Sequence, residues 1–383
     1  MKSGYLQGQL QELEDSGIYR SLRTVDSPQG REITLEGKQV LNFCSNDYLG
    51  LANDARIKKA ALEAIETYGL GAGASRLVCG NMSPHERLEA ELAHFKNAQS
   101  ALVYTSGYMA NTGIIPALAD RTSVVLCDQL NHASIIDGII LSRAKLIRYP
   151  HMDMEALQNI LKSLPAAQRK LIVTDSVFSM DGDKAPLKDI VDLAGQFEAT
   201  VMVDEAHAFG VLGKSGSGLV EELELEGQVD VQMGTLSKAA GCFGAYVCGT
   251  KILREYLINK SRSFIYTTAM PPVLAQAARR ALQIIRQGDD LRRQLQYKAN
   301  YIRKELDKMG FDTMNSSTPI IPILVKDPLR AMAMSKRLLQ QGIFMQAIRP
   351  PTVPLGTARL RLTVMATHTQ EDLDKLLNAL RVL

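Results

Sequence analysis

One lysine stands among residues that could do chemistry together. Lys238 lies in the stretch Gly234–Gly241, with Thr235 and Ser237 beside it and a glycine at each end. A lysine that is withdrawn from water has a lowered pKa and becomes a nucleophile. Hydroxyl side chains can donate hydrogen bonds to a phosphate. We therefore interpret Lys238 as the residue that holds an aldehyde cofactor as an imine, although a lysine taken alone is usually solvated.

Two further side chains suit the same pocket. Asp204 ends the apolar run 201–203, and His207 follows within one turn. An aspartate in this place can simply cap the next helix. Beside a pyridine nitrogen, however, it keeps that nitrogen protonated and makes the ring an electron sink. His132 is either a solvated loop residue or a ring that stacks on the pyridine and touches substrate.

The elements that must position these residues alternate between strand and helix from residue 100 onward. The expected strands are 101–104, 124–127, 145–148, 171–174, 200–203, 231–233 and 245–248. Their continuous apolar runs predict a mainly parallel sheet covered by helices on both faces. Ligands bind beyond the carboxyl ends of such strands. Polar residues gather at five of these ends, namely 106–107, 128–132, 175–183, 204–207 and 235–238.

The rest of the chain adds a second, smaller unit. Apolar residues at helical spacing predict a helix over residues 1 to about 25, which either lies on its own domain or also helps to form an oligomer or cover an active site. The other expected elements are a hairpin of 33–35 and 40–43, helices at 55–68, 273–309, 329–341 and from Thr369, and strands at 320–325, 343–348 and 359–364. The predicted division is a segment of residues 1–50, a large cofactor-binding domain of 51–274 and a small α+β domain of 275–383.

Composition excludes several classes of protein. The chain has 383 residues, with 44 Lys and Arg against 41 Asp and Glu, so its net charge of +3 offers no footprint for nucleic acid or anionic membrane. The five cysteines form no C-x-x-C pair, which favours a reducing compartment over a disulfide framework. We see no zinc spacing, no signal peptide and no membrane-spanning run. The prediction is a cytoplasmic protein without a metal.

Several motifs together resemble the α-oxoamine synthase family. These motifs are Ser45–Gly50, Gly71–Arg76, Asn131–Ser134, Val177–Asp183, Asp204–His207, Gly234–Lys238, Ile265–Pro272 and Arg359–Thr363. The resemblance implies a fold-type I pyridoxal-phosphate (PLP) transferase, aspartate aminotransferase-like. It also implies a mainly parallel seven-stranded sheet in a large α/β domain, a smaller α+β C-terminal domain, and a homodimer with shared active sites.

The resemblance assigns cofactor roles residue by residue. Lys238 would hold PLP and move protons at the substrate α-carbon, Asp204 would pair with the pyridinium nitrogen, and His132 would stack on the ring. The full set of implied cofactor contacts is Gly107, Tyr108, His132, Ser179, Asp204, His207, Thr235, Ser237, Lys238 and Thr268. Lys238, His132, Asp204 and His207 form the implied catalytic group. Tyr108 departs from the phenylalanine often found in the family, and Thr268 would reach the phosphate of the neighbouring subunit.

The resemblance also implies the substrates. The family joins an amino acid to an acyl thioester and releases carbon dioxide. The stretch Ala347–Pro354 most resembles the member that uses L-alanine and pimeloyl-CoA or pimeloyl-ACP in biotin biosynthesis; the alternative is glycine with acetyl-CoA. Implied substrate contacts are Arg20, Asn46, His132, Arg349, Thr352 and Arg361, with Arg23 an alternative to Arg20. A PLP-sensing transcription regulator would need a DNA-binding extension, and a non-catalytic scaffold subunit would lack Lys238.

Overall fold

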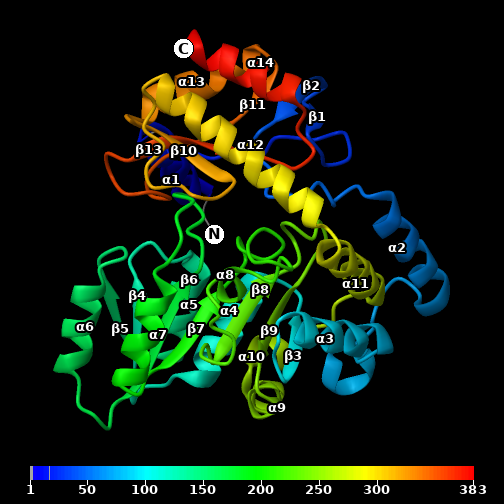
Figure 1. Ribbon diagram of the computed structural model, residues 1–383, viewed down its shortest axis with the longest axis vertical. Helices are drawn as coiled ribbons and strands as arrows, with labels where there is room; N and C mark the ends of the chain where they lie inside the picture. The colour runs from blue at the N-terminus through cyan, green and yellow to red at the C-terminus, as the bar shows by residue number, and fades with distance from the viewer. Residues whose placement is uncertain (1–2, 17) are drawn as a thin grey trace.

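A seven-stranded sheet forms the centre of the larger part of the molecule (Figure 1). The computed structural model describes residues 3–16 and 18–383. In spatial order the strands are β3 (Ser100–Tyr104), β9 (Ala245–Gly249), β8 (Val231–Thr235), β7 (Thr200–Asp204), β6 (Arg169–Asp175), β4 (Ser123–Asp128) and β5 (Lys145–Tyr149). Only β9 among these seven runs antiparallel to its neighbours. The predicted mainly parallel seven-stranded sheet is therefore confirmed.

Helices cover both faces of this sheet, as the continuous apolar strands require. One face packs on α4 (Gly107–Leu118), α5 (Ala133–Ser142), α9 (Lys251–Lys260) and α10 (Arg262–Ile265). The other packs on α3 (Ser83–Phe95), α6 (Met154–Ser163), α7 (Leu187–Gln196), α8 (Leu219–Glu222) and α11 (Pro272–Arg286). Helix α2 (Ala55–Tyr68) lies against α11, and a single π-helical turn occupies Arg76–Gly80. Because these helices pack on the two faces of the sheet, they leave uncovered the edge at which the carboxyl ends of its strands lie.

Two small sheets build the second unit, which lies above the carboxyl ends of the large sheet (Figure 1). One sheet orders β10 (Ile320–Lys326), β13 (Ala358–Thr363) and β12 (Gln346–Ile348); the other orders β1 (Glu32–Leu35), β2 (Lys38–Asn42) and β11 (Ile343–Phe344). The helices of this unit are α12 (Asp289–Lys308), α13 (Pro328–Gln340) and α14 (Gln370–Arg381). The predicted hairpin is confirmed, since Glu36 and Gly37 have φ of 50° and 77° in the two-residue turn.

Two expected elements are wrong in detail. The helical stretch expected over 273–309 is two helices, because glycine at position 288 disfavours a helix interior and the acidic residues after it favour a new helix start. The strand expected over 343–348 is also two, because Ile343 and Phe344 pair with β2 whereas 346–348 pair with β13. The predicted boundary at residue 274 falls inside α11, and the division into domains stays a prediction.

The N-terminal helix is shorter than expected and leaves its apolar side chains uncovered. Helix α1 (Ser3–Asp15) ends ten residues before the expected limit near residue 25. Part of the expected span, residues 1, 2 and 17, lies outside the described residues. Tyr5, Leu6, Leu10 and Leu13 are all exposed, so this helix does not bury an apolar face on its own chain. Among the described residues, no helix has the length and hydropathy to cross a membrane.

Candidate active site

Lys238 follows the carboxyl end of β8 and faces a group of acidic side chains. Its Nζ lies 3.4 Å from Thr235 Oγ1. Burial lowers the pKa of Lys238, while Asp204 and Asp175 oppose that shift. A lysine with a lowered pKa has a larger neutral, nucleophilic fraction at physiological pH. Lys238, predicted from its glycine-flanked motif to form an imine, therefore lies in surroundings that favour a nucleophilic amine.

Asp204 ends β7 and is held from two sides. Its Oδ2 accepts a hydrogen bond from Asn111 Nδ2 at 2.9 Å, and its Oδ1 accepts one from the Ala206 amide at 2.9 Å. The side chain is 4% exposed. Asn111 also donates to Ser134 Oγ at 2.9 Å, which fixes the amide between α4 and α5. The carboxylate is thus buried and oriented, yet each oxygen keeps a free lone pair for another donor.

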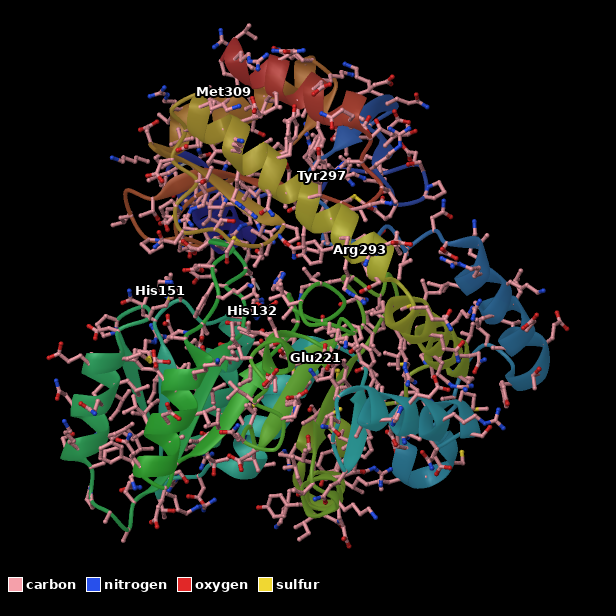
Figure 2. The ribbon with its side chains drawn as sticks, in the orientation of Figure 1. His132, His151, Glu221, Arg293, Tyr297 and Met309 are labelled. Carbon is pink, nitrogen blue, oxygen red and sulfur yellow. The ribbon has the colours of Figure 1, made fainter. Side chains whose placement is uncertain are left out.

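His132 caps α5 and is positioned by a second buried carboxylate. Its backbone amide donates to Asp175 Oδ2 at 2.7 Å, and Asp175 lies directly beside Asp204 in the register of β6 and β7. Burial and the neighbouring Asp204 raise the pKa of Asp175 well above its ordinary value. Desolvation lowers the pKa of His132 despite the attraction of Asp204. The ring is therefore neutral near pH 7 and open to the space above the strand ends (Figure 2).

His207 is held by a tyrosine from the N-terminal segment. Its Nδ1 lies 2.6 Å from the Tyr48 hydroxyl, which is 3.3 Å from Asn46 Oδ1. Burial and then the positive charge of Lys238 push the pKa of His207 well below its ordinary value. The neutral ring keeps one nitrogen available after the tyrosine contact. This network ties the motif around residue 48 to the loop after β7.

The amino end of α4 meets the carboxyl end of β8 in a cradle that has room only for glycine. A Cβ added at Gly107 would lie 2.7 Å from Thr235 Cγ2, closer than side chains approach one another. The first backbone N–H groups of a helix have no partner inside it, and they attract phosphate. These N–H groups suit the phosphate of PLP, the Asp204 carboxylate suits its ring nitrogen, and the Lys238 amine suits its aldehyde. The residues present therefore fit PLP. In the described part of the chain, no group of three or more His, Cys, Asp or Glu side chains could hold a metal ion.

Arg361 closes the site from the small unit. Its three nitrogens each donate one hydrogen bond, to the Ser179 carbonyl at 2.7 Å, Thr363 Oγ1 at 3.0 Å and Asn46 Oδ1 at 3.0 Å. The residue is 7% exposed. A guanidinium has five N–H groups, so two remain for a carboxylate. The sequence-predicted pair of Asn46 and Arg361 is brought into direct contact.

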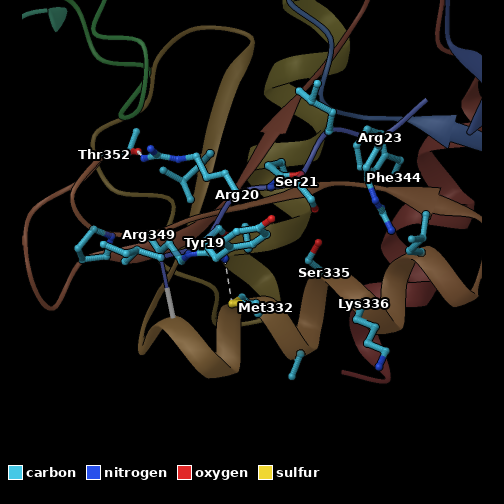
Figure 3. A pocket seen from close by; sticks show the side chains of 18 residues that line it. Tyr19, Arg20, Ser21, Arg23, Met332, Ser335, Lys336, Phe344, Arg349 and Thr352 are labelled. Carbon is cyan, nitrogen blue, oxygen red and sulfur yellow. Dashed lines mark hydrogen bonds between the residues drawn. The ribbon is translucent and has the colours of Figure 1, made fainter. Parts of the chain in front are cut away.

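A cleft beside the small unit collects the residues expected to meet the acyl substrate (Figure 3). Arg20 Nη2 donates to Thr352 Oγ1 at 3.3 Å, and Arg349 Nη2 donates to the Tyr19 carbonyl at 2.7 Å. The cleft has a volume of about 760 Å³. Arg23 lines it too, but pairs with Glu36 at 3.5 Å. The structure thus brings Arg20 into contact with Thr352, a second residue expected to meet the acyl substrate.

The side chains of four other predicted residues make no hydrogen bond to Lys238, Asp204, His132 or His207 among the described residues. Ser237 is exposed, and Ser179 uses its carbonyl rather than its hydroxyl toward Arg361. Tyr108 is exposed and donates to Asp137 Oδ2 at 2.6 Å, so the added hydroxyl points to α5. Thr268 is exposed in a small cavity that Thr105 also lines. Its predicted role lies across a subunit boundary and is not tested within one chain.

Three residues of this geometry were missed as site residues from the sequence. Asn111 is a lone buried amide among the apolar residues of α4, and this contrast is the signal that could have identified it. Asp175 stands at a strand end that the sequence did mark, although no role was given to it. Tyr48 belongs to the motif Ser45–Gly50, but only the folded chain brings it to His207.

Comparison with known proteins finds matches over nearly the whole chain. Residues 38–380 match the model of the family described as aminotransferase class I and II. The chain is 53% identical to 8-amino-7-oxononanoate synthase of Geobacter sulfurreducens (strain ATCC 51573 / DSM 12127 / PCA) over 97% of this chain and 96% of that protein. A variant of serine palmitoyltransferase from S. paucimobilis, with PLP and myriocin bound, has a TM-score of 0.94 and 32% identity, covering 98% and 96% of the two chains.

A solved structure of a similarly named enzyme aligns as well. The 8-amino-7-oxononanoate synthase from Francisella tularensis has a TM-score of 0.78 and 30% identity, covering 90% of this chain and 97% of that chain. These similarities extend over nearly the full length of each protein.

Proposed function

This chain belongs to the class I and II aminotransferase family, and from that membership we propose that it acts as an 8-amino-7-oxononanoate synthase. The reaction joins L-alanine to a pimeloyl thioester and yields 8-amino-7-oxononanoate, carbon dioxide and a free thiol, in biotin biosynthesis. One observation carries the proposal: relatives with this name share 47% to 53% of their residues with nearly the whole chain. PLP is the cofactor.

The residues at the strand ends have separate roles toward the cofactor. Bound PLP supplies a ring that accepts the electron pair left when a bond at the substrate α-carbon breaks. Asp204, oriented by Asn111, would hold the ring nitrogen of that cofactor. Lys238 Nζ would hold its aldehyde end and move the proton at the α-carbon, for which the lowered pKa of Lys238 suits it. His132 would cover one face of the ring, and because its pKa is lowered its own ring would add no positive charge there.

The substrates are held by the smaller unit. Arg361, aimed by the Ser179 carbonyl and Asn46, binds the alanine carboxylate with the N–H groups that the protein leaves free. The acyl chain lies in the cleft where Arg20 meets Thr352, with Arg349 donating to the Tyr19 carbonyl of the N-terminal segment beside it. Gly107, Tyr108, Thr235 and Ser237 would hold the phosphate of the cofactor. His207 and Ser179 would donate hydrogen bonds near its phenolic oxygen.

The working form is a homodimer with shared sites. Thr268 is exposed on its own chain, which suits a residue that reaches the phosphate end of a partner's site. The uncovered apolar side chains of α1 likewise suit a face that a second copy covers. The predicted cytoplasmic location fits five cysteines that all remain free thiols.

Release of free thiol tests the substrate assignment. Purified protein with PLP is assayed with L-alanine and pimeloyl-CoA, with L-alanine and pimeloyl-ACP, and with glycine and acetyl-CoA. We expect thiol release with alanine and at least one pimeloyl thioester. Preference for glycine and acetyl-CoA would overturn the assignment in favour of glycine C-acetyltransferase, and the two pimeloyl arms identify the carrier.

A further inference from the structure

A histidine outside the proposed site bridges two carboxylates. His151 follows β5 and is half-buried, and its Nδ1 lies 3.0 Å and 3.1 Å from the two oxygens of Asp128. Its Nε2 lies 2.8 Å from Asp183 Oδ2. Ionised carboxylates only accept hydrogen bonds, and a neutral imidazole carries only one N–H. Between two ionised carboxylates both ring nitrogens must donate, so the geometry points to a charged imidazolium.

The surroundings of the ring support that charge. Burial by itself lowers the pKa of His151, but the hydrogen bonds to Asp128 and Asp183 outweigh it and raise the pKa to about 10. The edge of the ring packs on Phe178, with centroids 4.5 Å apart and planes at 88°. Asp128 and Asp183 are the charged groups that meet the ring.

The two carboxylates differ in how far they depend on His151. Asp128 also accepts hydrogen bonds from the amides of Leu130 at 2.8 Å and Met152 at 2.8 Å. Asp183 Oδ2 accepts from His151, whereas the other oxygen, Oδ1, is buried without a partner among the described residues. Asp128 is therefore a fixed anchor, and Asp183 is the group that the histidine holds in place.

The loop that Asp183 ends carries the contacts to both arginines of β13. The Ser179 carbonyl accepts from Arg361 Nε at 2.7 Å, and Asp181 Oδ1 accepts from Arg359 Nη1 at 2.6 Å. The Gly182 carbonyl accepts from Thr318 Oγ1 at 2.9 Å. The loop 178–183 therefore joins the large sheet to the small unit, and His151 ties it to the end of β4.

We propose that His151 is a positioning residue, which as an imidazolium holds loop 178–183 so that the Ser179 carbonyl aims Arg361 at the amino acid carboxylate. This role rests on the proposed function for the identity of the amino acid. The hydrogen bonds of the His151 ring go to Asp128 and Asp183, so it acts on Arg361 only through the loop. We call the contacts of His151 with Asp128 and Asp183 the clamp. Without the clamp the loop shifts, and Arg361 then loses one of the three hydrogen bonds that orient it.

The first test reads the charge directly and needs no activity. The six histidines are labelled with ¹⁵N, and the ring signals of the PLP-loaded protein are recorded at pH 8, with His151→Gln assigning the resonance by difference. An ordinary histidine is neutral at that pH. We expect both ring nitrogens of His151 to be protonated. A neutral tautomer at pH 8 would overturn the clamp.

The second test separates positioning from general stability. L-Alanine binding is followed by the absorbance change of bound PLP in wild type, His151→Gln and Arg31→Gln. Arg31 is the matched control, because its Nη1 meets both oxygens of Asp372 at 2.7–2.8 Å in the small unit without touching the loop. We expect about tenfold weaker alanine binding in His151→Gln, the size of one lost charge-assisted contact, and less than twofold in the control.

The remaining readouts exclude a merely structural role. The KM for the acyl thioester should change less than twofold in His151→Gln, and amide exchange of the protein without PLP should rise in residues 176–186 only. Asp183→Asn, which keeps the acceptor but loses the charge, should weaken alanine binding, and the double variant should be no worse than His151→Gln. The proposal is refuted if His151→Gln binds alanine as tightly as wild type, or if the alanine affinity and the KM for the acyl thioester change equally. It is also refuted if the losses of alanine affinity in His151→Gln and Asp183→Asn add in the double variant. If the wild-type protein does not bind alanine, the proposed function fails. The ¹⁵N ring signals and the amide exchange then still test whether His151 is charged and holds the loop.

Discussion

A buried ion pair beside the site offers a stability test with a calculable size. Lys96, at the end of α3, and Glu205, the residue after Asp204, are both 0% exposed. Lys96 donates to Glu205 Oε2 and, at 2.7 Å, to the Ser217 carbonyl. Glu205 Oε1 accepts from the Val220 amide at 3.0 Å. The perturbation is Lys96→Met, which keeps the volume and removes the charge.

The cost follows from what the change leaves behind. In Lys96→Met, Glu205 remains in the interior with one amide donor and no counter-charge. Removing one partner of a buried pair costs about 3–5 kcal/mol, against a total stability of about 5–15 kcal/mol. In the double variant Lys96→Met/Glu205→Gln the neutral amide still accepts from Val220 and can donate toward Ser217. We therefore expect the second change to restore about 2 kcal/mol.

Urea unfolding followed by circular dichroism, at one fixed PLP concentration, measures these differences, because bound ligand itself adds stability. Arg169→Met is the control: its pair with Asp120 spans 3.1 Å with both side chains 58% exposed, and such pairs contribute at most about 1 kcal/mol. A loss below about 1 kcal/mol in Lys96→Met would refute the reasoning. So would a double variant that is no more stable than the single one.

Three further changes address the site itself. Lys238→Ala should abolish the visible absorbance of the purified protein, and a retained band contradicts the lysine assignment. Asp204→Asn should keep the fold, seen by circular dichroism, but slow α-proton exchange in alanine by about 100-fold, since charge facing the ring is lost; near-normal exchange argues against its role. Gly107→Ala should weaken PLP binding about tenfold, because its Cβ would lie 2.7 Å from Thr235 Cγ2. Gly195→Ala, with no atom within 4 Å of the added Cβ, is its control, and equal PLP affinity in the two variants rules out the cradle.

Much of the fold was predictable because apolar runs and turn residues, which are local features of the sequence, indicate its strands. Continuous apolar runs marked all seven strands of the large sheet, and the turn at Glu36 and Gly37 marked the hairpin. One error came where the local pattern and the pairing partner disagree. Residues 343–348 read as one strand, yet the buried Met345 separates two short strands that belong to different sheets. Strand pairing depends on neighbours distant in sequence, which no single window contains.

The site divides in the same way. Lys238 and Asp204 stand at strand ends, so their convergence follows from parallel topology alone. Asn111 was missed because an amide within a helix says nothing about which carboxylate it will meet.

By itself, the sequence determined the lysine, the acidic partner and the sheet that presents them, because motif spacing and apolar periodicity are local properties of the chain. Only the tertiary structure decided which distant side chains meet. Tyr48 contacts His207, Arg20 contacts Thr352, and His151 joins the carboxylate at the end of β4 to that of Asp183. The reason is physical: hydrogen bonds between such residues form only after the chain has closed long loops, and the packing of the whole core sets that geometry.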